Sequence, residues 1–344
     1  MSRELKTGDE LENSYVDERV KFLLPQFEAI APYRKQSQRK NGVDKLPGWQ
    51  KLATQEIRLL KITYPDDKPE HLKTYGTCLR QITALKKALK ISIKDYVKDQ
   101  GLHGAVNTIV TNFSRALTEH FAPYKANQSE LYREKVVERT QENNRVFIDL
   151  TNSLKFAHNI LTDIKNGNDV NWMDVSCSLA LVTGRRMGEI HLSASFNKID
   201  DYTIAFKGQL KGKSRRVKLG EKALPLRDVT FKIPTLIHAD LVCFGLQWLA
   251  DKGKRFDTTE DPERVNRRFS KTLNQHCKEF DIFPEDERTY HKFRAAYLRA
   301  CVVSFKPDNY DYLNYARSIL GDFDMNTIEA YQRYELKAGS ITRI

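Results

Sequence analysis

One stretch of this chain alternates apolar and polar residues, and helical spacing dominates the rest. Residues 202–206 (Tyr-Thr-Ile-Ala-Phe) alternate as a β-strand does, and residues 215–219 and 229–233 form two further short strands. The Gly- and Lys-rich residues 207–214 lie between the first two strands. We therefore expect a small antiparallel hairpin with a basic tip, inside a protein that is otherwise mainly α (α+β).

Apolar residues recur at helical intervals on both sides of residue 145. The polar run 138–145 separates the two parts, so we expect a helical domain over 1–145 and a second domain, helical with the small sheet, over 146–344. Gly184, a residue that commonly stops a helix, is expected to end the helix over 172–181. The helices are expected at about 15–30, 48–63, 69–90, 92–100, 104–121 and 127–144, then at 147–164, 172–181, 234–250, 263–280, 286–305, 310–320 and 327–336.

The charge of the chain narrows the class of partner. The 344 residues carry a formal net charge of +12, which favours a polyanion such as nucleic acid or an anionic membrane surface. No apolar run is long enough for a transmembrane helix, and the polar start lacks the apolar core of a signal peptide. We therefore expect a cytoplasmic protein that binds nucleic acid. A merely basic soluble enzyme is the alternative.

The cysteines predict neither a disulfide framework nor a zinc site. They are five in number, widely spread and without a Cys-x-x-Cys pair, which is typical of buried thiols in a reducing cytoplasm. The eight histidines show no metal-ligand spacing either. We expect no metal and no cofactor.

Two groups of basic residues could lie against a DNA backbone, although solvated surface residues are the alternative for each. The first group belongs to the Lys-, Arg-, Gln- and Gly-rich stretch 31–47. The second lies on the outer face of the helix over 69–90, opposite its apolar side. The candidates are Arg34, Lys35, Arg39 and Lys40 in the first group, and Arg80, Lys86 and Lys87 in the second.

Four residues in the second domain form, in chain order, a set that can break a DNA strand without a metal. A tyrosine can attack a phosphate and keep its bond energy in a phosphotyrosine link. Arginine forks fit the non-bridging oxygens, and a lysine on a hairpin can protonate the leaving oxygen. The set is Arg186, Lys211, Arg294 and Tyr331.

Each of these residues also has a plainer interpretation. The arginines could brace helices, Lys211 could be a solvated turn residue, and Tyr331 and Tyr334 could be core aromatics. His291 could be structural as well. Glu189, three residues after Arg186, is expected to pair with it on one helical face. The order and spacing of the whole set favour the catalytic interpretation.

The boxes that carry these residues resemble those of the tyrosine recombinases. Residues 183–190 (Thr-Gly-Arg-Arg-Met-Gly-Glu-Ile), with two consecutive arginines, are most similar to the first-arginine box of the telomere resolvases, or protelomerases. Residues 206–211 resemble their hairpin box, and residues 290–297 their second-arginine box. Residues 320–331, from Leu-Gly-Asp to Tyr331, resemble the closing box, whose spacing favours Tyr331 over Tyr334 as nucleophile.

The resemblance implies a fold, an activity and site residues. It implies a helical core-binding domain and a catalytic domain that clamp double-stranded DNA at an inverted repeat, as a homodimer that forms hairpin ends. An integrase or resolvase that exchanges strands in a tetramer is the alternative, and a non-catalytic DNA-binding relative is a further one. The source would be a bacterial, phage or plasmid replicon. The implied catalytic residues are Tyr331, Arg186, Lys211, Arg294, His291 and Asp322, with Arg185, Lys207 and Lys213 among the DNA contacts.

One position departs from the family pattern. The closing box usually has histidine after Leu-Gly, and this chain has Asp322. A histidine would donate a hydrogen bond to the phosphate, whereas an ionised aspartate would repel it. We expect Asp322 to be protonated, or to turn away while His291 or another donor compensates, or activity to be reduced.

Overall fold

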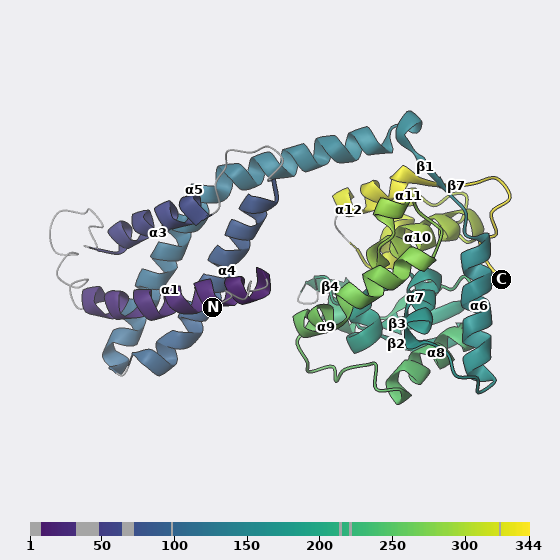
Figure 1. Ribbon diagram of the computed structural model, residues 1–344, viewed down its shortest axis with the longest axis horizontal. Helices are drawn as coiled ribbons and strands as arrows, with labels where there is room; N and C mark the ends of the chain where they lie inside the picture. Colours follow the sequence, from purple (N-terminus) through teal and green to yellow (C-terminus); the bar gives the residue numbers. More distant parts are fainter. Residues whose placement is uncertain are drawn as a thin grey trace, which may run out of the picture. The chain divides into compact units, whose positions relative to one another are not determined.

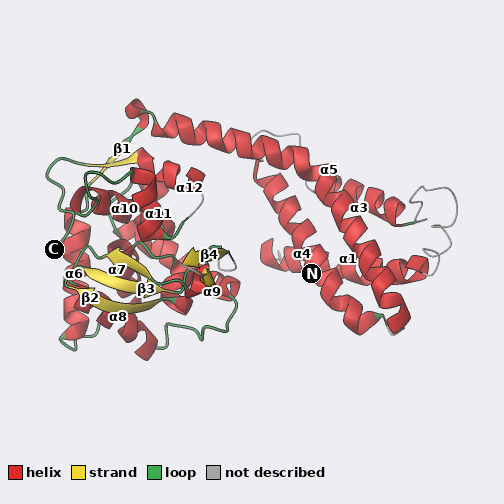
Figure 2. Ribbon diagram, turned by 180° about the vertical axis from the view of Figure 1, so that it is seen from behind, coloured by secondary structure: helices red, strands yellow, loops and turns green. Residues whose placement is uncertain are grey.

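The computed structural model describes residues 8–31, 48–63, 72–97, 99–212, 215–219, 222–322 and 325–344. Contacts divide the chain into two compact units, Met1–Tyr132 and Arg133–Ile344. This division falls within the long helix that ends at Thr140, whereas residue 145 lies beyond that helix, so the domain boundary at 145 stays a prediction. Helices dominate both units, and the strands of the described residues all belong to the second (Figure 2), which confirms the mainly α fold with a small sheet.

The first unit is built from amphipathic helices around an apolar core. Leu23 and Phe27 of the first helix meet Phe113 of the last, with the Phe27 and Phe113 rings 5.1 Å apart. Glu56 is fully buried, and Arg19 pairs with it at 2.7 Å, which ties the first two described helices together. The helices are α1 (Gly8–Ile30), α3 (Trp49–Thr63), α4 (Leu72–Tyr96) and α5 (Gln100–Thr140).

Two helices are longer than the sequence predicts. α4 continues through residues 91–92, where we expected a break, and α5 continues through Pro123, where we expected one helix to end and another to begin. A proline removes one intrahelical hydrogen bond, and a helix with strong helical segments on both sides can continue through it. The two expected pairs of helices are therefore two single helices.

The sheet of the second unit differs from the expected hairpin. β3 (Thr203–Lys207) is the central strand of an antiparallel sheet, between β2 (Ser195–Asp200) and β6 (Phe231–Pro234). β4 (Arg216–Leu219) pairs instead with β5 (Lys222–Pro225) in a separate ribbon. The expected pairing of 202–206 with 215–219 is therefore wrong, because both edges of β3 are already occupied. β2, which the sequence analysis did not predict, takes one of these edges.

Apolar helices pack around α7 (Trp172–Thr183), which is buried along almost its whole length (Figure 1). α6, α8, α9 and α10 all contact it, so its carboxyl end is held firmly inside the unit. The helices of this layer are α6 (Thr151–Lys165), α8 (Ala239–Asp251), α9 (Pro262–His276) and α10 (Phe293–Ser304). α11 (Tyr312–Leu320) packs against α10 and β6.

The two ends of the second unit contain strands where helices are expected. β1 (Val146–Ile148) precedes α6, and β7 (Tyr334–Leu336) follows α12 (Met325–Ala330) and the single turn η9 (Tyr331–Arg333). β1 and β7 pair in parallel. The helices expected over 147–164 and 327–336 are therefore shorter, because their outermost residues pair with each other.

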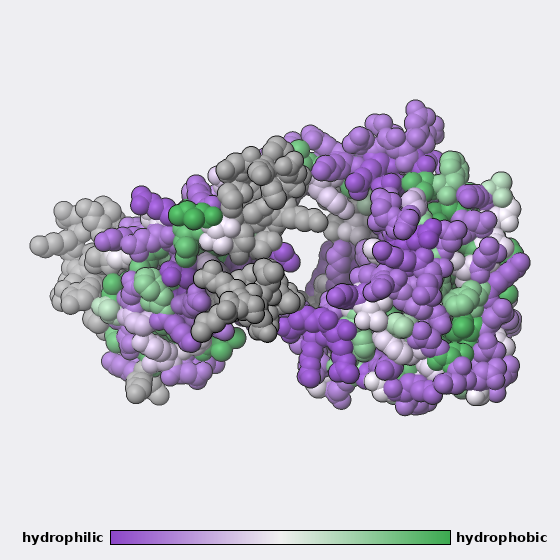
Figure 3. Space-filling model, in the orientation of Figure 1, coloured by the Kyte–Doolittle hydropathy of each residue, from purple (hydrophilic) through white to green (hydrophobic). Residues whose placement is uncertain are grey.

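The surface of the second unit is largely hydrophilic on the face that Figure 3 shows. None of the helices in the described parts of the chain is both long enough and apolar enough to cross a bilayer.

Candidate active site

The central residues of the site follow two left-handed turns, each at the end of a helix. Gly184 ends α7 and Gly321 ends α11, each with φ of +65°. This conformation favours glycine, and a Cβ atom on Gly184 would also lie 2.2 Å from the ring of Tyr297. The two turns bring Arg186, just after the first, against Asp322, just after the second.

Side chains from three separate segments satisfy the carboxyl end of α11. The carbonyl of Ile319 accepts a hydrogen bond from Arg185 at 2.8 Å, and that of Leu320 accepts one from Arg294 at 2.6 Å. Gln209 donates to the carbonyl of Gly321 at 3.1 Å. Such carbonyls have no partner within their own helix and attract positive charge. The three boxes are therefore joined at one helix end.

Arg185 belongs to this buried support and not to the surface. Its guanidinium lies 4.4 Å from the centre of the Phe206 ring, and the residue is only 1% exposed. We expected Arg185 to contact DNA, and in this fold its side chain does not reach the surface. The carbonyl of Ile319 and the face of Phe206 replace water around the guanidinium, which explains how the charge is accommodated.

Arg186 lies between two carboxylates. One guanidinium nitrogen is 3.0 Å from Glu189 Oε1, which confirms the expected pair, and the other is 2.6 Å from Asp322 Oδ2. Lys211 Nζ is 3.3 Å from Asp322 Oδ1 and 3.2 Å from Thr327 Oγ1. Asp322 thus bridges the two cations that the sequence singled out, and its side chain is 2% exposed.

Tyr331 lies beside His291. The hydroxyl oxygen is 3.3 Å from His291 Nε2, and the tyrosine is 5% exposed. Burial raises the pKa of Tyr331, and the positive charges of Arg294 and Arg186 offset part of this effect. Both arginines therefore lie close enough to stabilise negative charge on the tyrosine oxygen.

His291 can accept a hydrogen bond from the Tyr331 hydroxyl. The residue as a whole is exposed, but its ring lies against that of Tyr331, with the ring centres 6.2 Å apart. Burial of the ring, together with the charges of Arg294 and Arg186, lowers the pKa of His291 to about 4. The imidazole is therefore neutral at pH 7, and a neutral Nε2 can serve as an acceptor.

Arg294 is in the site but is also a structural brace. The residue is 1% exposed, and its two terminal nitrogens donate to the carbonyls of Gly184 and Leu320. Burial, with Arg186 and Arg185 nearby, lowers the pKa of Arg294 to about 9, so the group is still charged at pH 7. Its Nε atom is buried and has no hydrogen-bond partner, so its N–H is available to donate to a bound phosphate.

Tyr334, the second candidate nucleophile, has other partners. Its hydroxyl contacts Glu287 and Lys292, and Arg333 also pairs with Glu287. Burial raises the pKa of Tyr334, and the Glu287 carboxylate raises it further. The geometry favours Tyr331, because only Tyr331 has its hydroxyl beside a neutral histidine.

The candidate DNA contacts fall into three groups. Lys207 ends β3 with a half-exposed side chain, 4.0 Å from Asp228. The α4 candidates are all exposed, whereas Lys213 and the arm residues lie outside the described residues. The exposed candidates are Arg80, Lys86 and Lys87, and those outside the described residues are Arg34, Lys35, Arg39, Lys40 and Lys213.

Sequence reasoning gave no role to several residues that build the site. Gln209 lies inside the hairpin box, next but one to Lys211, and Thr327 lies inside the closing box, so their positions were a usable signal. Lys292 and Glu287 contact the Tyr334 hydroxyl. Lys292 lies inside the second-arginine box, whereas Glu287 lies outside every box and had no such signal.

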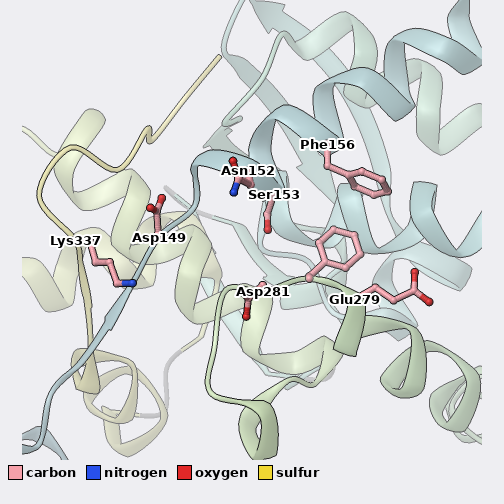
Figure 4. Close-up of a pocket in the computed structure, with 8 residues that line it drawn as sticks. Asp149, Asn152, Ser153, Phe156, Glu279, Asp281 and Lys337 are labelled. Carbon is pink, nitrogen blue, oxygen red and sulfur yellow. The ribbon is translucent and has the colours of Figure 1, made fainter.

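Other clusters of the second unit lie apart from these residues. A pocket of about 540 Å³, lined by Asp149, Phe156 and Lys337 among others, contains none of the candidate catalytic residues (Figure 4). In another cluster, the two ring nitrogens of His276 face different carboxylates, Asp174 at 2.6 Å and Glu279 at 3.3 Å. One ion cannot bind both nitrogens of one imidazole, so this cluster is best explained by contacts between the side chains themselves. The absence of a metal or cofactor stays a prediction.

Comparison with known proteins agrees with the boxes in the sequence. The profile described as telomere resolvase ResT/TelK catalytic domain matches residues 144–334. The protelomerase of Klebsiella oxytoca phage phiKO2 is 30% identical over 167 residues, covering 46% of this chain and 26% of the relative. The protelomerase of Escherichia phage N15 is 29% identical over 219 residues, covering 58% of this chain and 33% of the relative. The chain thus spans about a quarter to a third of the length of these relatives.

Solved structures show the same fold. A protelomerase TelA variant covalently complexed with substrate DNA has a TM-score of 0.60 at 17% identity, covering 86% of this chain and 85% of that chain. Another TelA variant, complexed with DNA hairpin product, has a TM-score of 0.56 at 17% identity, covering 90% and 94%. The profile match extends over more than half of the chain and includes Arg186, Lys211 and Tyr331. The chain therefore belongs to the telomere resolvase ResT/TelK family, of the tyrosine recombinase type.

Proposed function

We propose that this protein breaks and rejoins DNA strands through a covalent link between Tyr331 and a 3′-phosphate. The observation that carries the proposal is the position of the Tyr331 hydroxyl, 3.3 Å from His291 Nε2 and within the field of Arg294 and Arg186. A nucleophile, a proton acceptor and charge stabilisation thus meet at one oxygen, as strand cleavage requires.

The cleavage step is balanced by the side chains of the site. The Tyr331 oxygen forms a bond to phosphorus while its proton passes to His291 Nε2. The bond between phosphorus and the 5′ oxygen breaks, and Lys211 gives that oxygen a proton. Arg186 and Arg294 stabilise the charge on the non-bridging oxygens. This scheme requires neither a metal nor a cofactor.

The Asp322 carboxylate must release Arg186 and Lys211 when DNA binds. Its carboxylate now holds Arg186 at 2.6 Å and Lys211 at 3.3 Å, and a phosphate needs these same two cations. We propose that the phosphate replaces the carboxylate, which turns away. This resolves the difficulty that an ionised aspartate raises in the closing box.

Rejoining of the strands is proposed to give hairpin ends. A free 5′-hydroxyl attacks the phosphotyrosine, which releases Tyr331 and restores the phosphodiester. The family membership, and the TelA complex with a DNA hairpin product, support attack by the hydroxyl of the complementary strand. A homodimer on an inverted repeat would act at both strands, in the cytoplasm of the bacterial host of the replicon.

The first unit is proposed to hold the DNA backbone. The exposed basic residues Arg80, Lys86 and Lys87 of α4 can neutralise phosphates without reading sequence. A merely solvated face remains the alternative. Substitution of all three by glutamine should reduce the salt dependence of DNA binding if they contact phosphates.

The product of the reaction tests the function. A linear duplex that carries the inverted-repeat target and has open ends is incubated with the protein, denatured, cooled quickly and run on a gel. Fragments with hairpin ends return to full duplex at once, whereas fragments from strand exchange between two duplexes do not. Recombined products without snap-back would replace hairpin formation by the integrase-type reaction.

The role of Lys211 has a chemical test of its own. Lys211→Ala should slow cleavage of ordinary DNA, because the 5′ oxygen then leaves without a proton. A sulfur atom in place of that oxygen leaves readily as a thiolate and should restore the rate. If the sulfur substrate is cleaved as slowly as the ordinary one, Lys211 is not the acid.

A further inference from the structure

The strand that follows Tyr331 pairs with the strand that begins the second unit. β7 and β1 run in parallel, with Tyr334 opposite Val146, Glu335 opposite Phe147 and Leu336 opposite Ile148. They lie side by side just beyond the end of α5 (Figure 1). The other ladders of the described residues are antiparallel and local, whereas this one joins segments from opposite ends of the unit.

A side chain on β7 reinforces this pairing. Glu335 lies between two arginines, 3.0 Å from Arg145, which directly precedes β1, and 3.1 Å from Arg299 of α10. We call strands β1 and β7, with Arg145, Arg299 and Glu335, the β1–β7 clasp. The two segments remain hydrogen-bonded beyond the clasp, since Lys337 donates its backbone N–H to the carbonyl of Ile148 at 2.9 Å.

The pocket of Figure 4 lies beside the segments that follow β1 and β7. Asp149 follows β1 and Lys337 follows β7, and both line this pocket. The backbone N–H of Leu150 donates to Ser340 Oγ at 3.0 Å, and that of Ile341 donates to Thr151 Oγ1 at 3.0 Å. The carboxyl-terminal segment is thus fastened to the start of α6 as well as to β1.

The clasp begins within one turn of the nucleophile. The backbone N–H of Tyr334 donates to the carbonyl of Tyr331, so β7 is continuous with the turn that carries the tyrosine. On the other side of the turn, His291 contacts the Tyr331 hydroxyl, and Lys292 and Glu287 contact Tyr334. A shift of β7 along β1 would therefore move the Tyr331 hydroxyl relative to His291.

We propose that the β1–β7 clasp positions Tyr331 for attack, with Arg145 and Glu335 as positioning residues. The inference rests on the proposed function of Tyr331 as nucleophile. α5 ends at Thr140 and β1 begins at Val146, so the clasp is also the point where the chain that leaves α5 meets the chain that leaves the nucleophile. If DNA binding displaces the segment between α5 and β1, the β1–β7 clasp would pass this displacement on to Tyr331.

Glu335→Gln tests the clasp with little change to the fold. The Arg145 and Glu335 side chains are each 32% exposed, so their ion pair contributes little to stability. Glutamine keeps the length of the side chain but removes the charge that holds both arginines. We expect covalent Tyr331–DNA adduct to form roughly tenfold more slowly at saturating DNA, because small displacements of a reacting group have large kinetic effects. DNA affinity, measured with Tyr331→Phe added, should change by less than about twofold, because no phosphate contact is lost.

Glu260→Gln is the matched control. Glu260, just before α9, forms a surface pair with Arg264 of α9 at 2.6 Å, outside the clasp. This control should cleave at the normal rate. Arg145→Ala should slow cleavage as well, and the double variant Arg145→Ala with Glu335→Gln should be no slower than Glu335→Gln alone, since Arg145 acts through Glu335. Equal rates for Glu335→Gln and Glu260→Gln would overturn the proposal.

A second measurement does not depend on cleavage. With 3-fluorotyrosine at position 331, the ¹⁹F resonance reports the surroundings of the ring in the DNA-free protein. Glu335→Gln should shift or broaden this resonance, and Glu260→Gln should not. An unchanged resonance would contradict the clasp. Failure of the wild-type protein to form any adduct on the inverted-repeat duplex would instead contradict the proposed function.

Discussion

Replacement of Asp322 by asparagine probes the phosphate site most directly. In the DNA-free protein, Asp322 Oδ2 lies 2.6 Å from a guanidinium nitrogen of Arg186, and Oδ1 lies 3.3 Å from Lys211 Nζ. A phosphate that binds these cations must first break both contacts. Breaking these contacts costs free energy, which weakens DNA binding. A side chain that holds Arg186 and Lys211 less strongly than aspartate should therefore strengthen DNA binding.

The structure sets the size of the effect. A hydrogen bond to a charged group contributes about 1.5–3 kcal/mol, and the buried contact with Arg186 is expected in this range. The Lys211 side chain is 44% exposed, so solvent screening reduces its contact to less than about 1 kcal/mol. Asparagine keeps a neutral hydrogen bond of about half the strength. Asp322→Asn should therefore bind DNA more tightly by about 1–2 kcal/mol, or roughly five- to thirtyfold.

The affinity is measured by fluorescence anisotropy with a labelled inverted-repeat duplex at one fixed salt concentration. Tyr331→Phe is added to every variant so that no cleavage disturbs the equilibrium. Asp240→Asn is the matched control, because Asp240 pairs with Lys198 at 2.7 Å on the surface and its loss changes the net charge equally. If Asp322→Asn binds no more tightly than Asp240→Asn, the carboxylate does not compete with phosphate and the argument is refuted.

Further predictions concern the nucleophile, the histidines and Arg185. Tyr331→Phe should abolish the covalent adduct and leave DNA binding nearly intact, whereas Tyr334→Phe should still form adduct; an adduct with Tyr331→Phe would transfer the role to Tyr334. The rate of adduct formation should show no loss that is due to His291 until the pH approaches its pKa of about 4, which a pH–rate profile of single-turnover cleavage measures. Burial also lowers the pKa of His191 from 6.5 to about 4, so below pH 6.5 the unfolded chain takes up a proton that the folded protein does not. Stability should be lost as the pH falls through this window, by up to about 3 kcal/mol, and urea unfolding at pH 7 and pH 4.5 checks it. Arg185→Met should lower the melting temperature but leave the slope of log affinity against log salt unchanged, whereas a lost phosphate contact would reduce that slope by about 1.

The sequence by itself determined the features that depend on local pattern. Helical spacing located α7, and Gly184 ends it because a left-handed residue stops a helix. The pair between Arg186 and Glu189 follows from their three-residue spacing. The order of the four boxes pointed to a family, and the profile of that family matches the residues that contain them. These features involve neighbours within a turn or short motifs, so no knowledge of the fold was needed.

Only the tertiary structure decided the features that depend on remote partners. Arg185 and Arg186 follow a helix end, where no periodic pattern assigns one to the core and the other to the site. Their partners Ile319 and Asp322 both come from the end of α11, far along the chain. Likewise, residues 334–336 form a strand because β1 pairs with them. A residue can be assigned to core, site or sheet only when its partner is in place, and the fold alone places partners that are distant in sequence.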